Sequence, residues 1–296
     1  MSAKALIETG LRAAEIPLAR QVKIWARFTD EKADVAASLT RTVRALHKAL
    51  PLDQELRALS IGSSGEPQFR LLHALCQKGL FLFDIDEKAL ATVSERLDRQ
   101  MVKNVFPVQG DYLQDFADRD SALATLRAKL GDAPFDLICL HHCLYYCDVE
   151  QWPAFIETLY DAVLAPTGAM HLAMMSARET EEGTTTWLYN HFARKFFGAE
   201  TSHDLLRLRD QLSNSTAVSD VCLNSETKQV HFWVDDFEQY MAVIWMILLY
   251  PDGHDYDLDQ RTEIVEFVIR HFWEPRRKIV QTQDYLSIFK GPPPTS

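Results

Sequence analysis

Between residues 56 and 178 the chain alternates short apolar runs with helix-like stretches, and this alternation constrains the fold more than any other feature. Strand, turn, helix and strand in succession are typical of βαβ units, whose strands pair in parallel. The sequence therefore predicts an α/β fold, with a mostly parallel sheet and helices on both faces. The predicted strands are residues 58–62, 80–84, 105–109, 135–140 and 169–175, and strand-like segments at 218–234 and 278–290 bring the sheet to seven.

Helices are expected between these strands, at residues 68–77, 87–97, 120–129 and 150–164. The first 50 residues contain amphipathic helical segments, in which Val22, Trp25 and Phe28 recur at helical spacing. After residue 178 the alternation stops, and helical segments at 187–197, 237–250 and 260–273 interrupt the strands. We therefore expect three parts: an N-terminal helical lid (1–50), a ligand-binding core (51–178), and a helical, substrate-binding insertion with C-terminal strands that complete the sheet (179–296).

The first predicted strand ends in a turn of small residues. Such residues let the backbone turn sharply and approach a ligand closely, so Gly62, Ser63 and Gly65 are candidate cofactor contacts. A dinucleotide requires the later glycines of G-x-G-x-x-G, and this chain has Ser64 and Pro67 at those positions. S-adenosylmethionine (SAM), which carries ribose and adenine but no phosphate, fits this turn better.

Acidic residues follow the next two predicted strands. Asp84 lies 19 positions after Gly65 at the end of the second strand, where a carboxylate suits the hydroxyl pair of a ribose. Asp86 competes for this role, or else caps the next helix. Asp111, with Tyr112 beside it, follows the third strand and is placed for the amino group of adenine; the alternative is an ordinary turn aspartate.

The fourth predicted strand ends in two adjacent histidines, His141 and His142, which are followed by Tyr145 and Tyr146. This grouping favours contact with a ligand over a purely structural role. In open parallel sheets, ligands bind beyond the carboxyl ends of the strands. The strand ends should therefore surround a single cleft, and His142 and Tyr146 are its candidate catalytic residues.

Four short motifs resemble one enzyme family. Residues 59–66 give Leu-Ser-Ile-Gly, small residues and Glu; residues 144–146 give Leu-Tyr-Tyr; residues 286–289 give Leu-Ser-Ile-Phe; and residues 22–28 give Val-x-x-Trp-x-Arg-Phe. By these motifs the chain resembles class I SAM-dependent methyltransferases, and more narrowly the histamine N-methyltransferase family. The resemblance covers most of the chain apart from its middle third. It implies a Rossmann-like sheet and SAM as the cofactor.

The same resemblance implies roles for single residues. The SAM contacts fall on Gly62, Glu66, Asp84 and His141, and the acceptor contacts on Asp34, His142, Tyr145, Tyr146, Trp187 and Asp284. The family has Gln in place of His142 and Asn in place of Asp284, which makes the acceptor pocket of this chain more acidic. Three of these contacts have an alternative without function: Trp187 packs in an aromatic helix, Asp34 lies on a solvated helix, and Asp284 lies on an edge strand.

Charge and cysteine content limit the partners. The net charge of −11 argues against a nucleic-acid surface and favours a cationic ligand. The odd number of cysteines, five, and the lack of a recognisable signal peptide predict a reduced, cytoplasmic protein. The longest apolar run, residues 241–250, is too short to span a membrane and is expected to form a buried helix. Cysteines and histidines cluster between residues 139 and 147, but residue 139 falls inside a buried strand, so we predict no metal site.

These observations predict a SAM-dependent methyltransferase of a small molecule, with N-methylation of an amine as the favoured reaction. Two alternatives stay open at this point. One is O-methylation of a small phenol or carboxylate, and the other is a SAM-binding protein that regulates without turnover. The oligomeric state and the identity of the acceptor are open as well.

Overall fold

The computed structural model describes residues 2–51, 53–62, 69–218, 221–249 and 253–291, with the backbone alone for residues 69–71. The chain folds into two compact units, and each is described by itself. The helical unit comprises residues 1–33, 175–204 and 227–283. The sheet unit comprises residues 34–174, 205–226 and 284–296. The division into a lid, a core and an insertion at residues 50/51 and 178/179 stays a prediction.

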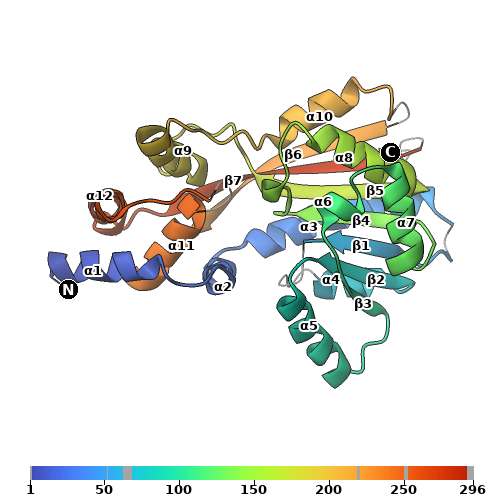
Figure 1. Cartoon of the computed structure of the whole chain (residues 1–296), viewed down its shortest axis with the longest axis horizontal. Coiled ribbons are helices and arrows are strands. Elements are labelled where there is room, and N and C mark those ends of the chain that lie inside the picture. Colours follow the sequence, from blue (N-terminus) through green and yellow to red (C-terminus); the bar gives the residue numbers. More distant parts are fainter. Residues whose placement is uncertain (1, 52, 63–68, 219–220, 250–252, 292–296) are drawn as a thin grey trace. The chain divides into compact units, whose positions relative to one another are not determined.

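Within the described ranges, seven strands form one sheet in the order β3-β2-β1-β4-β5-β7-β6 (Figure 1). Strand β1 pairs in parallel with β2 and with β4, β2 pairs with β3, and β4 pairs with β5. The predicted Rossmann-like, mostly parallel sheet is therefore confirmed. The strands are β1 Arg57–Ile61, β2 Gly79–Asp84, β3 Val105–Gln109, β4 Phe135–His141, β5 Leu164–Met175, β6 Val221–Phe232 and β7 Ile279–Lys290.

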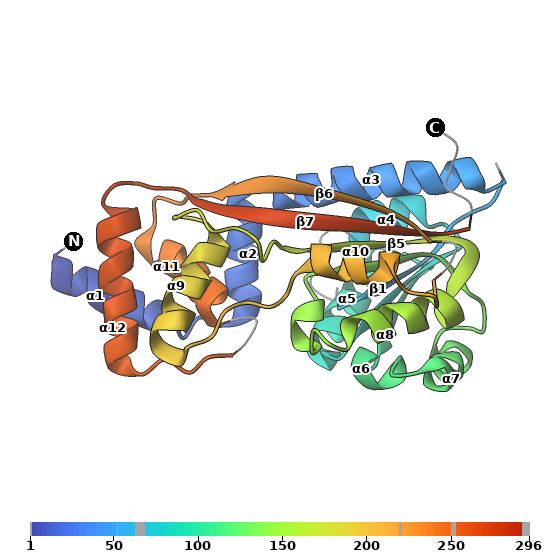
Figure 2. The same ribbon diagram turned by 90° about the horizontal axis from the view of Figure 1, so that it is seen from above.

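Helices cover both faces of the sheet unit, as the alternating pattern predicts. On one face lie α3 (Glu31–Ala49), α4 (Phe69–Leu75) and α5 (Glu87–Arg99), and on the other lie α6 (Tyr112–Asp115), α7 (Arg119–Lys129), α8 (Trp152–Thr158) and α10 (Leu205–Ser213). Figure 2 shows α3 and α4 on one side of the strands and α6 to α8 on the other. Strand β4 is buried along its whole length, because it faces helices on both sides.

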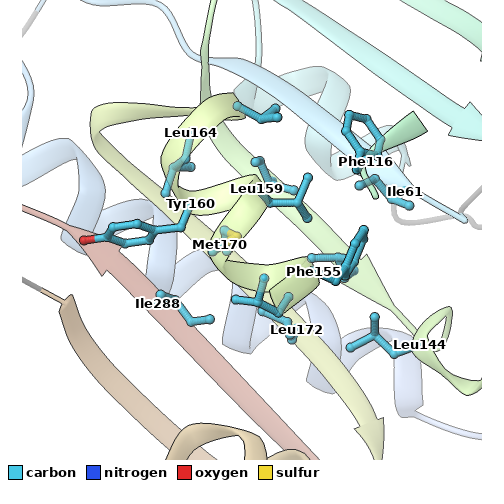
Figure 3. Packing of buried hydrophobic residues seen from close by; sticks show 14 of the residues in the cluster. Ile61, Phe116, Leu144, Phe155, Leu159, Tyr160, Leu164, Met170, Leu172 and Ile288 are labelled. Carbon is cyan, nitrogen blue, oxygen red and sulfur yellow. The ribbon is translucent and has the colours of Figure 1, made fainter. Parts of the chain in front are cut away.

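The larger core of the sheet unit includes side chains of α7, α8 and α10. Figure 3 shows part of this core, with Phe155, Leu159 and Tyr160 beside Met170 and Leu172. Side chains of α8 and of the π-helical turn that follows it, Leu159–Val163, pack onto β1, β4 and β5. Phe155, Leu159, Met170 and Leu172 are each at most 5% exposed. Full burial of side chains of this size stabilises the fold by about 1.5–3 kcal/mol each.

The helical unit is organised around α11 (Phe237–Leu249). This helix is buried on nearly every side and contacts α1 (Ala3–Ala13), α2 (Leu18–Phe28) and α9 (Thr185–Phe197). A helix that is apolar all round belongs in a core, so the predicted buried helix is confirmed over residues 237–249. None of the described helices combines the length and the apolar character needed to cross a membrane.

The boundary between α8 and β5 differs from the prediction. A single helix over residues 150–164 was expected, whereas α8 ends at Thr158 and a π-helical turn follows. Strand β5 then begins at Leu164, five positions before the predicted residue 169. Pro166 and Gly168 disfavour a regular strand, and the pairing of β5 with β4 is irregular between Phe135 and Leu137. The first part of β5 is therefore a distorted strand that apolar periodicity does not detect.

The close packing of α1 generates a prediction about stability. A Cβ atom at Gly10 would lie 2.5 Å from Cγ1 of Val265, a buried residue of α12 (Leu258–Val268), and the Gly10 carbonyl accepts a hydrogen bond from Trp245 at 2.8 Å. We expect Gly10→Ala to lower the free energy of unfolding by about 1–2 kcal/mol, because overpacking outweighs the roughly 1 kcal/mol of gained helix propensity. Chemical denaturation measures this loss.

Val265→Ala provides the matched background, because it removes the two methyl groups that the new Cβ would meet. In that background Gly10→Ala should be neutral or stabilising. An equal loss of stability in both backgrounds would show that the contact with Val265 is not the cause.

Candidate functional site

Parallel pairing brings the carboxyl ends of four strands to one edge of the sheet. Ile61, the last residue of β1, pairs with Phe83 of β2 and with Leu140 of β4, and Asp84 pairs with Gln109 of β3. The residues that follow, or end, these strands are the predicted site residues Gly62, Asp84, Asp111 and His141. The structure therefore brings this set together along one edge, as the sequence predicts for an open parallel sheet.

Gly62 makes the turn after β1. Its φ is +68°, in the left-handed region that favours glycine, and its N–H donates to the carbonyl of Phe83 at 2.8 Å. A Cβ here would lie 2.5 Å from Cβ of Cys143, so the turn has no room for a side chain. The other predicted residues of this turn, Ser63, Gly65 and Glu66, lie outside the described residues.

Asp84 and Asp86, the two candidates for a ribose contact, have different surroundings. Asp86 is the N-cap of α5, and its Oδ1 accepts the N–H groups of Lys88 and Ala89 at 3.0 Å each. Asp84 ends β2 itself, and its Oδ1 accepts the Asp86 N–H at 2.9 Å. The carboxylate of Asp84 is thus held at the strand end, whereas that of Asp86 serves the helix.

Asp111 and Tyr112 begin α6 beside the end of β3. The carboxylate of Asp111 caps the helix: Oδ1 accepts the Leu113 N–H and Oδ2 accepts from the Gln114 side chain, both at 3.0 Å. The hydroxyl of Tyr112 donates to the carbonyl of Cys143 at 2.7 Å. Burial, and to a lesser extent the nearby cysteines, raise the pKa of Tyr112, so its hydroxyl stays protonated and remains a donor.

His142 is held in an uncommon backbone conformation. Its φ is +52°, and its N–H donates to the carbonyl of Ala173 at 2.9 Å. Its Nδ1 lies 3.2 Å from the hydroxyl of Tyr145, and the two rings are nearly parallel. Tyr145 belongs to a 3-10 helical turn, Leu144–Tyr146, in which Tyr146 is 57% exposed.

His141 contacts a residue that the sequence analysis missed. Nε2 of His141 lies 2.8 Å from Nδ1 of His171 in β5, and Nε2 of His171 lies 3.0 Å from the hydroxyl of Ser38 in α3. His171 is completely buried, and burial, with smaller effects of His141 and Arg41, lowers its pKa well below the ordinary range. The sequence contains one signal that could have identified His171, namely a histidine in the middle of an otherwise apolar strand.

The two acidic acceptor candidates lie on elements that meet at this end of the sheet. Val35, which follows Asp34 in α3, packs with Ala173 of β5 and with Tyr285, which follows Asp284 in β7. Asp284 is fully buried and Asp34 partly buried. The alternative that placed Asp284 on an edge strand is wrong, because β7 lies between β5 and β6.

Trp187 belongs to the helical unit, where it lines an open pocket of about 260 Å³ with Glu179, Thr180, Asn190, His191 and Arg194. Its indole stacks on the ring of His191 at 4.8 Å, and His191 stacks in turn on Phe267 at 5.0 Å. Burial and the nearby Lys195 lower the pKa of His191. Both readings of Trp187, helix packing and a pocket wall, are thus compatible with its contacts.

None of the five cysteines forms a disulfide, and all but Cys222 are buried. Burial raises the pKa of Cys147 to about 11 and that of Cys76 to about 12, so both remain protonated at neutral pH. In the described part of the chain, no three His, Cys, Asp or Glu side chains gather in a way that would hold a metal ion. The absence of a metal requirement stays a prediction.

Solved structures with a similar fold are known. The YcgJ protein of Bacillus subtilis aligns with 85% of this chain and 99% of its own, at 14% identity and a TM-score of 0.51. A Bacillus halodurans C-125 protein, provisionally named a methyltransferase, aligns over the same shares at 16% identity and a TM-score of 0.50. A Galdieria sulphuraria protein, provisionally named a sarcosine dimethylglycine methyltransferase, aligns with 88% of this chain and 85% of its own, at 12% identity and a TM-score of 0.50.

No protein-family model and no curated protein sequence matches the chain. The resemblance to the histamine N-methyltransferase family therefore rests on the sequence motifs alone. The structural likeness, together with the strand order, shows that the chain has the Rossmann-like fold found in methyltransferases.

The different contacts of Asp84 and Asp86 generate a paired prediction. If Asp84 holds the ribose, Asp84→Ala should weaken SAM binding by about 2–3 kcal/mol, because it would remove charge-assisted hydrogen bonds. Asp86→Ala is the matched control: it should leave SAM affinity unchanged and lower the free energy of unfolding by about 1 kcal/mol through the lost cap. Calorimetric titration and denaturation measure both quantities. The opposite pattern of affinities would assign the ribose to Asp86.

Proposed function

We propose that the protein is a SAM-dependent methyltransferase that methylates the nitrogen of a small-molecule amine. The observation that carries the proposal is that Gly62 and Asp84 lie at the carboxyl ends of the adjacent strands β1 and β2. The left-handed backbone of Gly62 turns the chain directly after β1, and a carboxylate held at the next strand end suits a ribose. In the fold found in methyltransferases, this combination supports SAM over a dinucleotide.

The residues present fit a cofactor with ribose and adenine. Asp84 would hold the ribose, the Gly62 turn would accept the methionine part, and Asp111 and Tyr112 would flank the adenine. Asp111 is fixed by its own capping contacts, so its carboxylate is oriented before any ligand binds. SAM supplies an electrophilic methyl group on a sulfonium sulfur.

For this reaction the chain has to orient the acceptor and exclude water. Alignment of two reactants in one site lowers the activation free energy by several kcal/mol, and the protein needs to form no covalent intermediate. The acceptor amine has to be neutral to react, although free amines titrate near pKa 10. Loss of water from the bound amine favours its neutral form, and a nearby histidine such as His142 is a suitable proton acceptor.

Two carboxylates support an amine over a phenol. The sequence resemblance assigns Asp34 and Asp284 to the acceptor, and the elements that carry them pack together through Val35 and Tyr285. Negative groups attract a cationic amine, and aromatic faces add about 0.5–2 kcal/mol for an ammonium group.

A panel of acceptors tests the class of substrate. We expect turnover, measured as formation of S-adenosylhomocysteine, with small amines and none with phenols or carboxylic acids. Asp284→Asn should raise KM for the amine by about tenfold, since one charged contact is lost. Asp161→Asn, at an exposed ion pair with Arg119, is the control and should change nothing. Turnover confined to phenols, or an unchanged KM in Asp284→Asn, would contradict the proposal.

The proposed proton acceptor gives a separate prediction about the rate. If His142 accepts the proton from the amine, His142→Asn should lower kcat by about 10²-fold, because the reacting nitrogen then has no base beside it. Initial-rate kinetics with a small amine measure kcat, and His47→Asn, at an exposed histidine of α3, is the control. An unchanged kcat in folded His142→Asn would exclude the role.

A further inference from the structure

On one face of β4 and β5, the side chains change from apolar to polar towards the carboxyl ends of the two strands. Leu137, Cys139 and Ala169 point to the side of the sheet covered by α3 and pack with apolar residues of that helix, Leu39 and Val43 among them. Because side chains alternate along a strand, His141 and His171 continue the same face. Two imidazoles thus follow an apolar row where a packing role alone would favour two more aliphatic residues.

The two histidines and Ser38 form a continuous chain of hydrogen-bonding groups. In the pairing of β4 with β5, His171 lies opposite Cys139, and His141 lies opposite Ala173, so the two rings meet on a diagonal. The rings are perpendicular, with centroids 5.0 Å apart. His171 is 0%, His141 2% and Ser38 3% exposed, so water does not compete for these contacts.

The chain couples the protonation of one ring to that of the other. A neutral imidazole has one N–H donor and one acceptor nitrogen, so the contact between His141 Nε2 and His171 Nδ1 needs one of each. If His171 donates its Nδ1–H, its Nε2 accepts the Ser38 hydroxyl and His141 carries its proton on Nδ1. If His141 donates instead, His171 donates to Ser38. Burial keeps His171 neutral, so these are the two arrangements available.

We propose that His171, supported by Ser38, is a positioning residue for the methyl-transfer site, which sets the tautomer and ring orientation of His141 at the carboxyl end of β4. This inference rests on the proposed function in one respect, namely that His141 contacts the cofactor. The link between the two histidines itself stands on the contacts alone. His171 acts through His141 and needs no contact with cofactor or acceptor.

Nitrogen-15 NMR of the full-length chain, labelled at histidine, tests the coupling. Long-range proton–nitrogen correlations distinguish the two tautomers, and the signals of His141 are identified by their absence in His141→Asn. We expect a single tautomer of His141 in the wild type. Ser38→Ala and His171→Leu should produce a mixture of tautomers, and His171→Asn, which restores a polar group near the position of Nδ1, should produce a smaller change.

Affinity for S-adenosylhomocysteine, measured by calorimetry, gives the functional readout. We expect about threefold to tenfold weaker binding in Ser38→Ala and His171→Leu, as for one lost hydrogen bond, with partial recovery in His171→Asn. Thr42→Val is the matched control, because Thr42 lies one turn further along α3. Its hydroxyl contacts that of Ser287 at 2.7 Å and donates to the backbone carbonyl of Ser38 at 3.4 Å, so the variant leaves the Ser38 hydroxyl in place. It should change neither readout.

Three outcomes would overturn the inference: an unchanged His141 tautomer in folded Ser38→Ala, an affinity loss in Thr42→Val as large as that in Ser38→Ala, or a tautomer change with unchanged affinity. Ser38→Ala removes a single oxygen atom, so it keeps the test open if the variants of His171 do not fold. Failure of the proposed function is distinguished by the wild type, which would then bind no S-adenosylhomocysteine whatever the tautomer of His141.

Discussion

Parallel pairing of β1 with β2 on one side and β4 on the other is the constraint on which the candidate site depends. A slip of one residue in either pair would turn every side chain of the strand to the opposite face. Since both faces are apolar and covered by helices, such a slip would also misplace the polar strand ends. The packing that fixes the register therefore also aligns Gly62, Asp84 and His141 along one edge of the sheet.

Contacts between the backbone of the loop after β4 and neighbouring elements help to hold this loop. The carbonyl of Cys143 accepts a hydrogen bond from the hydroxyl of Tyr112 in α6, and the Cβ of Cys143 packs against Gly62. The N–H of His142 donates to the carbonyl of Ala173 in β5. These contacts compensate the left-handed backbone of His142, which costs on the order of 1–2 kcal/mol. The tyrosines of the loop are therefore held by contacts to three neighbouring elements, as the alignment of reactants in the proposed methyl transfer would require.

Sequence patterns predicted the elements well where burial dominates. The buried strand β4 is a continuous apolar run and extends only one residue beyond the predicted bounds. Helix α5 begins after Asp86 because that residue caps it. Strand β3 has the predicted bounds as well, although it is a partly exposed edge strand. The start of β5 was not predictable, because Pro166 and Gly168 break the pattern. The partner of His141 was not predictable either, because a diagonal contact between strands depends on their register, and register is a property of the folded sheet.

In helix α3, one set of side chains stabilises the fold and another set orients the strands at the candidate site. Leu39, Val43 and Leu46 pack in the apolar core, where each contributes through burial. Ser38 and Thr42 lie on the same side of the helix, but contact polar atoms of β5 and β7 instead. A buried hydrogen bond adds only about 1 kcal/mol net, so these two hydroxyls contribute little to stability. Their directional contacts constrain how the strands meet at the site, which apolar packing alone would leave less defined.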